Sequence, residues 1–389
     1  MNSYTFYKVG LFRPLFFIFF LAFAGVSCEP NASSDSSNDR FDYYPSKTII
    51  NYAKGFKVEY FKSYKILEVF NLEDSTEVLQ RYFLVEEGTK APEMQAQDEL
   101  IRIPLASVAC LSTTQVAYLS ALGMSDKISG VGYASAIKDS LLLKQISEGW
   151  TMEITRAGQL DIERVLQSNT TFLMANAFDL LSVSTLSEFD IPVILSTEYL
   201  ESSPLARAEW IKFFALFFNA EKSADEYFRK IEMEYLMTKE ILEKEEGKPS
   251  VMFGSFYQGS WFVPGGESLV SVLFKDAGAR YIYEDQKTHN NINIDTESLM
   301  NRMENIDKWG FVLSKDGELS KSDFLAGDHR MIDLAKEVNM KYFYCNTFTS
   351  DYFGMANIQA DIVLKDLGKI FHPDLFPEHQ FVYFQPFKN

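Results

Sequence analysis

The chain contains 389 residues, of which 47% are hydrophobic and 23% charged, and its formal net charge is −17. This length gives room for two domains and a tail. The acidic excess argues against nucleic acid and against an anionic membrane surface as partners, since both would repel the protein, and it fits a soluble extracytoplasmic protein.

Residues 1–28 have the pattern of a secretion signal. Two basic residues, Lys8 and Arg13, precede an apolar stretch at 15–26 that is too short to span a bilayer. The small residues Ser27 and Cys28 follow it. The pattern resembles a bacterial lipoprotein signal, in which Cys28 becomes the lipidated first residue, although Gly25 stands where leucine is usual. Cleavage by an ordinary signal peptidase is the alternative. We expect residues 29–47, which begin with a polar serine-rich segment, to form a flexible tether.

Residues 48–219 predict an N-terminal α/β lobe. The alternating pattern from Thr48 to Val85 indicates added antiparallel strands. Short apolar runs then alternate with helical segments, which is typical of a mostly parallel sheet; the runs are 107–111, 128–132, 171–175 and 192–196. Ligands bind where such strands end. The polar and aromatic candidates at these ends are Ser112, Thr113, Gln115, Tyr133 and Asn176.

Residues 220–246 predict one long helix between two α/β halves. Asn219 can end the preceding segment and also cap this helix, and Gly247 with Pro249 supplies a stop. An apolar stripe runs along one face in steps of three and four: Ala224, Phe228, Ile231, Tyr235, Thr238 and Leu242. Residues 247–389 repeat the strand and helix alternation. We therefore predict two Rossmann-like lobes with mostly parallel sheets, bridged by a single long helix, with a ligand cleft between the lobes.

Enzyme signatures are missing from the sequence. It has no G-x-S-x-G, P-loop, C-x-x-C or H-E-x-x-H motif. Gly130 and Gly132 form a broken dinucleotide fingerprint, for which a strand-end turn is the better interpretation. The four histidines do not group with acidic residues at strand ends, so neither a metal site nor a cofactor is predicted. A secreted two-lobed metal-dependent hydrolase, which would need such clusters, is the rival class.

The second half opens with a cluster of aromatic residues. Tyr257 and Trp261 fall in a segment rich in Gly, Ser and Gln that follows a strand, and we expect a loop whose rings face a bulky ligand. Cys110 and Cys345 are expected in different lobes as buried free thiols. A disulfide between them is the alternative.

Glu163 and Glu297 occupy parallel places in the two halves, since each begins a helix that precedes a buried strand. One interpretation is a carboxylate favoured in a first helical turn. The other is a pair of acidic contacts, one on each lobe, for basic pockets of a partner protein. Spacing alone favours the first interpretation.

Several segments together resemble the helical-backbone, or class III, substrate-binding proteins of bacterial ABC importers for cobalamin or ferric siderophores. They are 107–132, GQLDIERVL with its following strand, 204–235, 260–282 and 361–379. The resemblance extends from Thr48 to the C-terminus. It implies a ligand held between two lobes with little hinge motion, and it implies that Glu163 and Glu297 dock on arginine pockets of a permease. Gln115 stands where relatives often have histidine.

The resemblance implies a periplasmic, lipid-anchored, monomeric protein that carries a metal chelate to an ABC permease dimer in the inner membrane. Ferric siderophore and cobalamin-like chelates are the expected ligands, and haem is an alternative because tyrosine is plentiful. The residues expected to contact the ligand are Ser112, Thr113, Gln115, Tyr133, Asn176, Tyr257 and Trp261.

Overall fold

The computed structural model describes residues 41–72, 77–303, 306–320, 323 and 341–387. The predicted signal peptide, Cys28 and the tether up to residue 40 lie outside these residues. No helix in the described ranges has the length and apolar composition that crossing a membrane requires. Packing begins earlier than predicted, because Tyr44 is buried with its ring edge against Tyr60. The last part of the predicted tether, from Phe41 on, is therefore folded.

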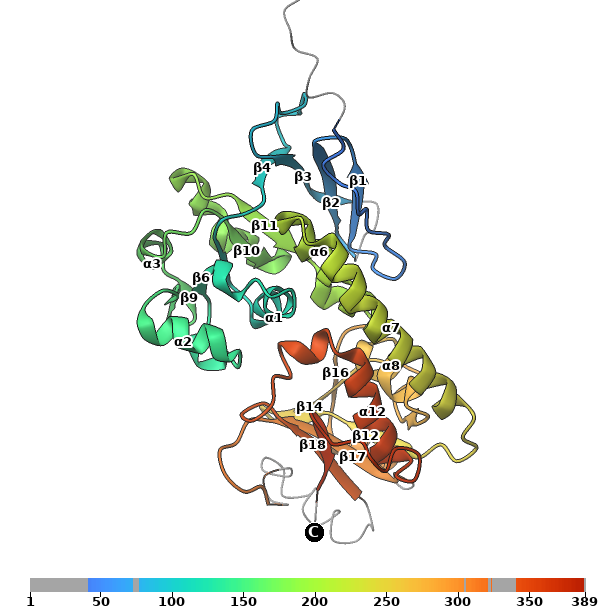
Figure 1. Ribbon diagram of the computed structural model, residues 1–389. Coiled ribbons are helices and arrows are strands. Elements are labelled where there is room, and N and C mark those ends of the chain that lie inside the picture. The colour runs from blue at the N-terminus through green and yellow to red at the C-terminus, as the bar shows by residue number, and fades with distance from the viewer. Residues whose placement is uncertain (1–40, 73–76, 304–305, 321–322, 324–340, 388–389) are drawn as a thin grey trace, which may run out of the picture. The chain divides into compact units, whose positions relative to one another are not determined.

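A four-stranded sheet opens the folded region (Figure 1). Its strands, in spatial order, are β1 (Phe56–Tyr60), β2 (Tyr64–Phe70), β3 (Val78–Glu86) and β4 (Glu99–Ile103). The first three are antiparallel, as predicted, whereas β4 pairs parallel to β3. Glu99 and Arg102 interrupt the apolar pattern of β4, so its sequence gives a weak strand signal.

The first lobe contains a second sheet of five parallel strands in the order β11-β10-β5-β6-β7. The strands are β5 (Val108–Cys110), β6 (Ile128–Val131), β7 (Met152–Glu153), β10 (Leu173–Asn176) and β11 (Val193–Ser196). The connecting helices are α1 (Thr113–Ala121), α2 (Ser140–Glu148), α3 (Ile162–Gln167) and α4 (Leu180–Val183). The chain builds outward from β5 through β6 to β7 and then returns to β10 on the other side of β5. The strand order thus reverses between β5 and β10, and such a reversal opens a crevice at the carboxyl ends of the strands.

An aromatic helical segment follows the first lobe. It comprises α5 (Pro204–Glu209) and α6 (Ile211–Ala215), with Pro204 at the first position of α5 and Ser203 as its N-cap. Trp210, Phe213 and Phe214 are fully buried. This segment packs the first lobe against the long helix.

The long helix α7 extends from Glu221 to Glu243. All six residues of the predicted stripe are buried, which confirms the face that the spacing indicated. The predicted cap is half wrong. Asn219 ends the preceding turn in a left-handed conformation, but its side chain bonds Lys65 and Glu86 instead of α7, whose N-cap is Ala220. The buried Lys65 competes for the asparagine because it needs hydrogen-bond acceptors.

The second lobe has a mixed five-stranded sheet in the order β15-β12-β17-β18-β19. These strands are β12 (Ser250–Phe253), β15 (Arg280–Tyr281), β17 (Lys308–Leu313), β18 (Lys341–Asn346) and β19 (Phe384–Pro386), of which only β19 is antiparallel to its neighbour. A smaller antiparallel sheet contains β13 (Ser255–Tyr257), β14 (Ser260–Val263) and β16 (Ile292–Ile294). The helices are α8 (Leu269–Asp276), α9 (Thr296–Arg302) and α12 (Ala360–Phe371). The predicted class, α/β with two mostly parallel sheets and one long helix, is confirmed.

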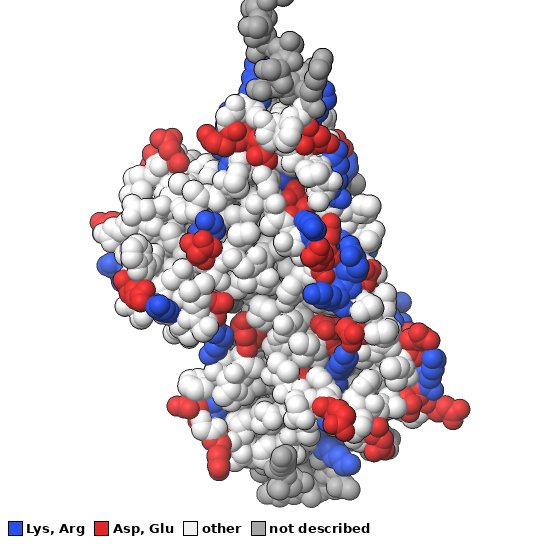
Figure 2. All heavy atoms as spheres, viewed as in Figure 1, with Lys and Arg blue, Asp and Glu red and all other residues white. Residues whose placement is uncertain are grey.

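Helix α7 makes polar contacts with both lobes. Asp225 accepts a hydrogen bond from Thr48 at 2.5 Å, whereas Tyr235 donates to Asp276 of α8 at 2.7 Å. Its solvent face carries charge pairs spaced one turn apart, and Figure 2 shows acidic and basic side chains intermingled along it. Cys110 and Cys345 are both free and buried, which excludes the alternative of a disulfide between them.

Candidate functional site

A pocket of about 680 Å³ lies at the carboxyl ends of β5, β6 and β10, beside the reversal of strand order. We call it the strand-end pocket. Its polar lining consists of Ser112, Thr113, Thr155, Gln159, Asn176, Asp179 and Ser182. Its larger apolar and aromatic side chains are Leu111, Tyr133, Leu160 and Phe178. Four of the predicted residues, Ser112, Thr113, Tyr133 and Asn176, therefore come together in one cavity.

The capping geometry of α1 places Ser112 and buries Gln115. Ser112 is the N-cap: its Oγ accepts from Thr114 N at 3.2 Å, and its own backbone amide donates to Gln115 Oε1 at 3.1 Å. Gln115 also donates to Ser196 at 3.2 Å and is fully buried. The candidates that follow β5 thus lie in the first turn of a helix. The prediction that Gln115 faces a ligand is wrong for this structure, because this capping box turns its side chain into the protein.

The end of β6 brings Tyr133 to the pocket. A Cβ atom on Gly132 would lie 2.1 Å from Leu111 O, so glycine is required for this close approach of β6 to β5. Thr155 fixes the same turn by donating to Gly132 O at 2.5 Å. The glycines at 130–132 thus form a strand end, as expected, and the ring of Tyr133 is 45% exposed at the pocket.

A tight turn after β10 supplies the acceptors of the pocket. Asn176 ends the strand, and its backbone amide donates to Asp179 Oδ2 at 3.2 Å. Asn176 is only 7% exposed; its side chain faces the backbone of Asp179 in a capping box, and Oδ1 accepts no hydrogen bond of standard geometry from the described residues. Burial raises the pKa of the Asp179 carboxyl. The turn therefore presents two oxygen acceptors that a ligand could engage.

A small hairpin contributes residues that the sequence analysis missed. Strands β8 (Thr155–Arg156) and β9 (Gln159–Leu160) pair across a turn in which Ala157 and Gly158 both have positive φ. Thr155, Gln159 and Leu160 line the pocket from this hairpin. The Ala-Gly pair was the available signal for a two-residue turn.

The two second-lobe candidates lie elsewhere. Gln258 and Gly259 have positive φ and join β13 to β14, so the predicted loop is a hairpin. Trp261 is 1% exposed and packs against Trp309 at 5.4 Å between ring centroids. Its predicted contact with a ligand is wrong for this structure, because β14 turns its indole into the core. Tyr257 is 61% exposed, outside the strand-end pocket.

The lobes touch directly beside the strand-end pocket. Thr114 Oγ1 donates to Phe353 O at 2.9 Å, and Lys138 donates to Phe348 O at 2.8 Å. A second cavity of about 380 Å³ lies here, lined by first-lobe residues such as Val116 and by second-lobe residues such as Tyr383. Thr113 borders both cavities, so the strand-end pocket adjoins the junction of the lobes.

Glu163 and Glu297 have matching local geometry. Glu163 is the second residue of α3, and Glu297 is the second residue of α9. Each helix has an aspartate as its N-cap, and both glutamate side chains are exposed. Asp161 accepts from Arg164 N at 3.2 Å, and Asp295 accepts from Ser298 N at 2.8 Å. The N-cap aspartates already satisfy the helix ends, so the glutamates remain available to a partner.

Metal-binding clusters of three or more His, Cys, Asp or Glu side chains do not occur among the described residues. Of the described histidines, His379 bonds Asp366 at 2.6 Å and His372 bonds Gly278 O at 3.1 Å. These are structural contacts at the end of α12. The arrangement at the strand-end pocket can bind through hydrogen bonds and ring contacts, and none of its residues forms a nucleophile–base pair.

Comparison with known proteins identifies related chains. The model of a family described as periplasmic binding protein matches residues 108–330, more than half of the chain. An uncharacterized lipoprotein of Methanocaldococcus jannaschii is 26% identical over 292 residues, which cover 72% of this chain and 68% of that protein. A second uncharacterized protein of that organism is 23% identical over 261 residues, 65% of this chain and 77% of its own length.

Solved structures share the fold at low identity. A periplasmic haem-binding protein from Pseudomonas aeruginosa superposes with a TM-score of 0.58 at 14% identity, covering 73% of this chain and 99% of that one. A periplasmic vitamin B12 binding protein of Vibrio cholerae gives a TM-score of 0.50 at 10% identity, covering 69% and 97%. At these identities the likeness shows the fold alone.

Proposed function

Because this chain belongs to the periplasmic binding protein family, we propose that it is the substrate-binding subunit of an ABC importer and delivers a metal chelate to a permease. The observation that carries the proposal is the strand-end pocket, where Ser112, Thr113, Tyr133 and Asn176 line one cavity beside the lobe junction. Its volume of about 680 Å³ lies in the range of small-molecule sites. As a binding protein, it catalyses no reaction.

The chemistry of the lining supports a bulky chelate with both polar and apolar surface. Hydroxyl and amide groups can orient the ligand, while the ring of Phe178, 65% exposed, offers apolar contact area at the rim. A ferric siderophore and a cobalamin-like corrinoid both have this character. We propose lipid anchoring through Cys28 as well, which the lipoprotein relative supports.

Calorimetric titration of the mature chain with ferric hydroxamates, ferric catecholates, cobalamins and haem tests the ligand class. We expect saturable binding of at least one chelate with a dissociation constant at or below about 1 μM, which corresponds to roughly −8 kcal/mol. Replacing Tyr133 by alanine should weaken that binding, because the ring borders the pocket. A folded protein that binds none of these compounds would contradict the proposal.

Haem remains the alternative ligand, since Tyr133 could supply a phenolate to iron from within the pocket. The replacement Tyr133→Phe distinguishes the two cases. It should change the absorption spectrum of a haem complex, whereas binding of a coordinatively complete chelate should survive with the ring intact. An unchanged haem spectrum would exclude Tyr133 as the iron ligand.

We expect little closure of the lobes around the ligand. Helix α7 is about 34 Å long at 1.5 Å per residue, and it is hydrogen-bonded to Thr48 on one side and Asp276 on the other. Bending it would break helical hydrogen bonds. The radius of gyration from small-angle scattering should therefore change little on ligand addition, and a marked contraction would show that the lobes close by another route.

A further inference from the structure

The lining of the strand-end pocket contains an acidic side chain and no basic one among the described residues. Asp179 is the only carboxylic acid among its lining residues, which otherwise present hydroxyls, amides, apolar groups and the phenol of Tyr133. Lysine and arginine side chains are absent from the lining that the described residues form. An anionic ligand would lose its hydration there without gaining a cationic partner, which is costly.

The basic residues of the neighbouring loops are already engaged. Lys138 donates to Phe348 O at 2.8 Å across the lobe junction, and Arg156 pairs with Asp161 at 3.0 Å. The N-terminus of α1 adds a partial positive charge, but the capping box of Ser112 and Gln115 already covers that end of the helix. Lys138 and Arg156 are thus held in contacts of their own, and neither is among the residues that line the pocket.

Besides its hydroxyl and amide groups, the pocket presents two side-chain oxygen acceptors on one turn, those of Asn176 and Asp179. Asn176 is more than nine-tenths buried, and its side chain faces the backbone of Asp179 in a capping box, yet Oδ1 accepts no hydrogen bond of standard geometry from the described residues. Asp179 follows on the same turn. Among the described residues, its carboxylate accepts one hydrogen bond, from the backbone amide of Asn176. A buried acceptor without a good partner, here Asn176 Oδ1, destabilises the empty site, and a ligand that supplies an N–H group removes that cost. Asp179 is partly buried and can still accept from an N–H group or a positive charge of a ligand.

We propose that the first-lobe half of the site selects uncharged or cationic chelates that donate N–H groups to Asn176 and Asp179, and discriminates against anionic ones. This inference rests on the proposed function and narrows its ligand class. Amide-rich hydroxamate chelates and corrinoids fit the site. Tricatecholate chelates, and haem with its propionates, carry the wrong charge for this lining.

The test compares three ferric chelates on the full mature chain by calorimetry: cationic ferrioxamine B, uncharged ferrichrome and an anionic tricatecholate. We expect the cationic or the uncharged chelate to bind at least about tenfold tighter than the anionic one. In Asp179→Asn, affinity for the cationic chelate should fall by about tenfold, while an uncharged chelate should lose less. Asparagine keeps an oxygen for Asn176 N, so the turn should be retained.

Asp190→Asn is the matched control, because Asp190 lies in the same lobe, is exposed and is outside the pocket. It should bind all three chelates as the unmodified chain does. Equal or tighter binding of the tricatecholate would overturn the inference and leave the proposed function standing. An Asp179→Asn variant that loses no affinity for a bound cationic chelate would also overturn it. Failure to bind these chelates, cobalamin or haem would instead refute the proposed function.

Discussion

Replacing both Glu163 and Glu297 by lysine should abolish import and leave chelate affinity unchanged. Each glutamate is exposed at the second position of a helix whose end is already capped by an aspartate, so neither is needed to close its helix. If each meets a basic pocket of the permease, reversal places like charges together. Such juxtaposition lowers affinity by roughly a hundredfold or more. Uptake of the chelate by cells, with calorimetry on the purified variant, measures both quantities.

The matched control reverses Glu226 and Glu240, two exposed glutamates on α7. It makes the same change in net charge, so a general electrostatic effect would impair it equally. We expect normal uptake from this control. Uptake that survives the reversal of Glu163 and Glu297 would return these residues to the simpler interpretation, carboxylates favoured at helix starts.

Local periodicity predicted the elements of this fold well. The stripe on α7, from Ala224 to Leu242, is buried in full because a helix packed on one side leaves a regular signature in the sequence. The ends of the strands could also be predicted from the sequence. Ser112, Tyr133 and Asn176, which lie at or just after such ends, line one pocket in the structure. In a parallel sheet, the position of a strand end in the chain also gives its position in space.

The orientation of individual side chains could not be predicted in the same way. Gln115 was expected to contact the ligand, but Ser112 caps a helix three residues earlier and turns the amide of Gln115 inward. Trp261 was expected at a ligand, but the Gln258-Gly259 turn makes a hairpin that points the indole toward Trp309. Both outcomes depend on tertiary partners, Ser196 for the first and the β17 strand for the second.

Asp179 was missed for a related reason. A carboxylate three residues after a strand is common in turns, and nothing in its sequence neighbours shows that the adjoining pocket has no lysine or arginine. The charge of a site is a property of all the loops that meet there. Residues 155–160 supply much of that lining from a hairpin of two-residue strands, which is too short to give a periodic signal.

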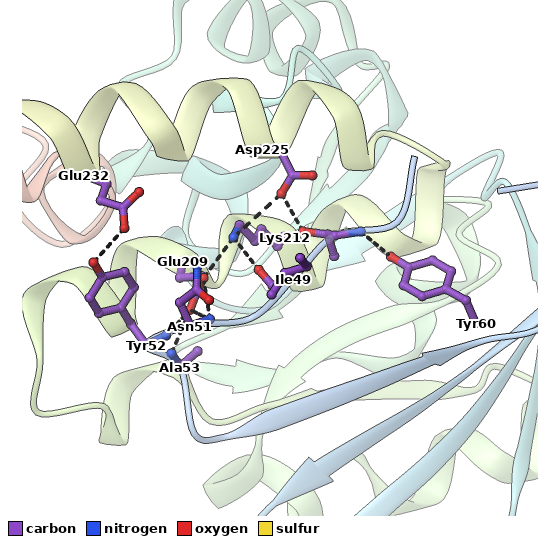
Figure 3. Close-up of polar contacts among 10 residues, drawn as sticks. Ile49, Asn51, Tyr52, Ala53, Tyr60, Glu209, Lys212, Asp225 and Glu232 are labelled. Carbon is purple, nitrogen blue, oxygen red and sulfur yellow. Dashed lines mark hydrogen bonds and ion pairs between the residues drawn. The ribbon is translucent and has the colours of Figure 1, made fainter. Parts of the chain in front are cut away.

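The buried carboxylate of Glu209 on α5 binds the backbone of residues 51–53, near the start of the described chain (Figure 3). Glu209 is fully buried and accepts hydrogen bonds from the backbone amides of Asn51, Tyr52 and Ala53 at 2.6 to 3.1 Å. It also pairs with Lys212 at 2.9 Å. One side chain of α5 thus accepts from three successive backbone amides of the segment that follows the proposed tether.

The replacement Glu209→Ala should destabilise the protein by roughly 3–5 kcal/mol, because it leaves a buried lysine short of its main partner and three amides without an acceptor. Lys212 would keep Ile49 O at 2.6 Å and the more distant Asp225 at 3.7 Å. The midpoint of urea unfolding measures the loss. Glu240→Ala, an exposed change on α7, should leave that midpoint unmoved.

Hydrogen exchange separates two ways in which Glu209→Ala could act. If the carboxylate holds the segment locally, the amides of residues 51–53 should exchange much faster than those of the five-stranded sheets, which stay protected until the protein unfolds as a whole. Glu209→Gln should show a smaller effect, since its amide oxygen can still accept from part of the segment. An unfolding midpoint and an exchange pattern equal to those of Glu240→Ala would show that backbone packing alone holds residues 49–53. The burial of Glu209 argues against that result, because a carboxylate is taken out of water only where its hydrogen bonds offset the loss of hydration.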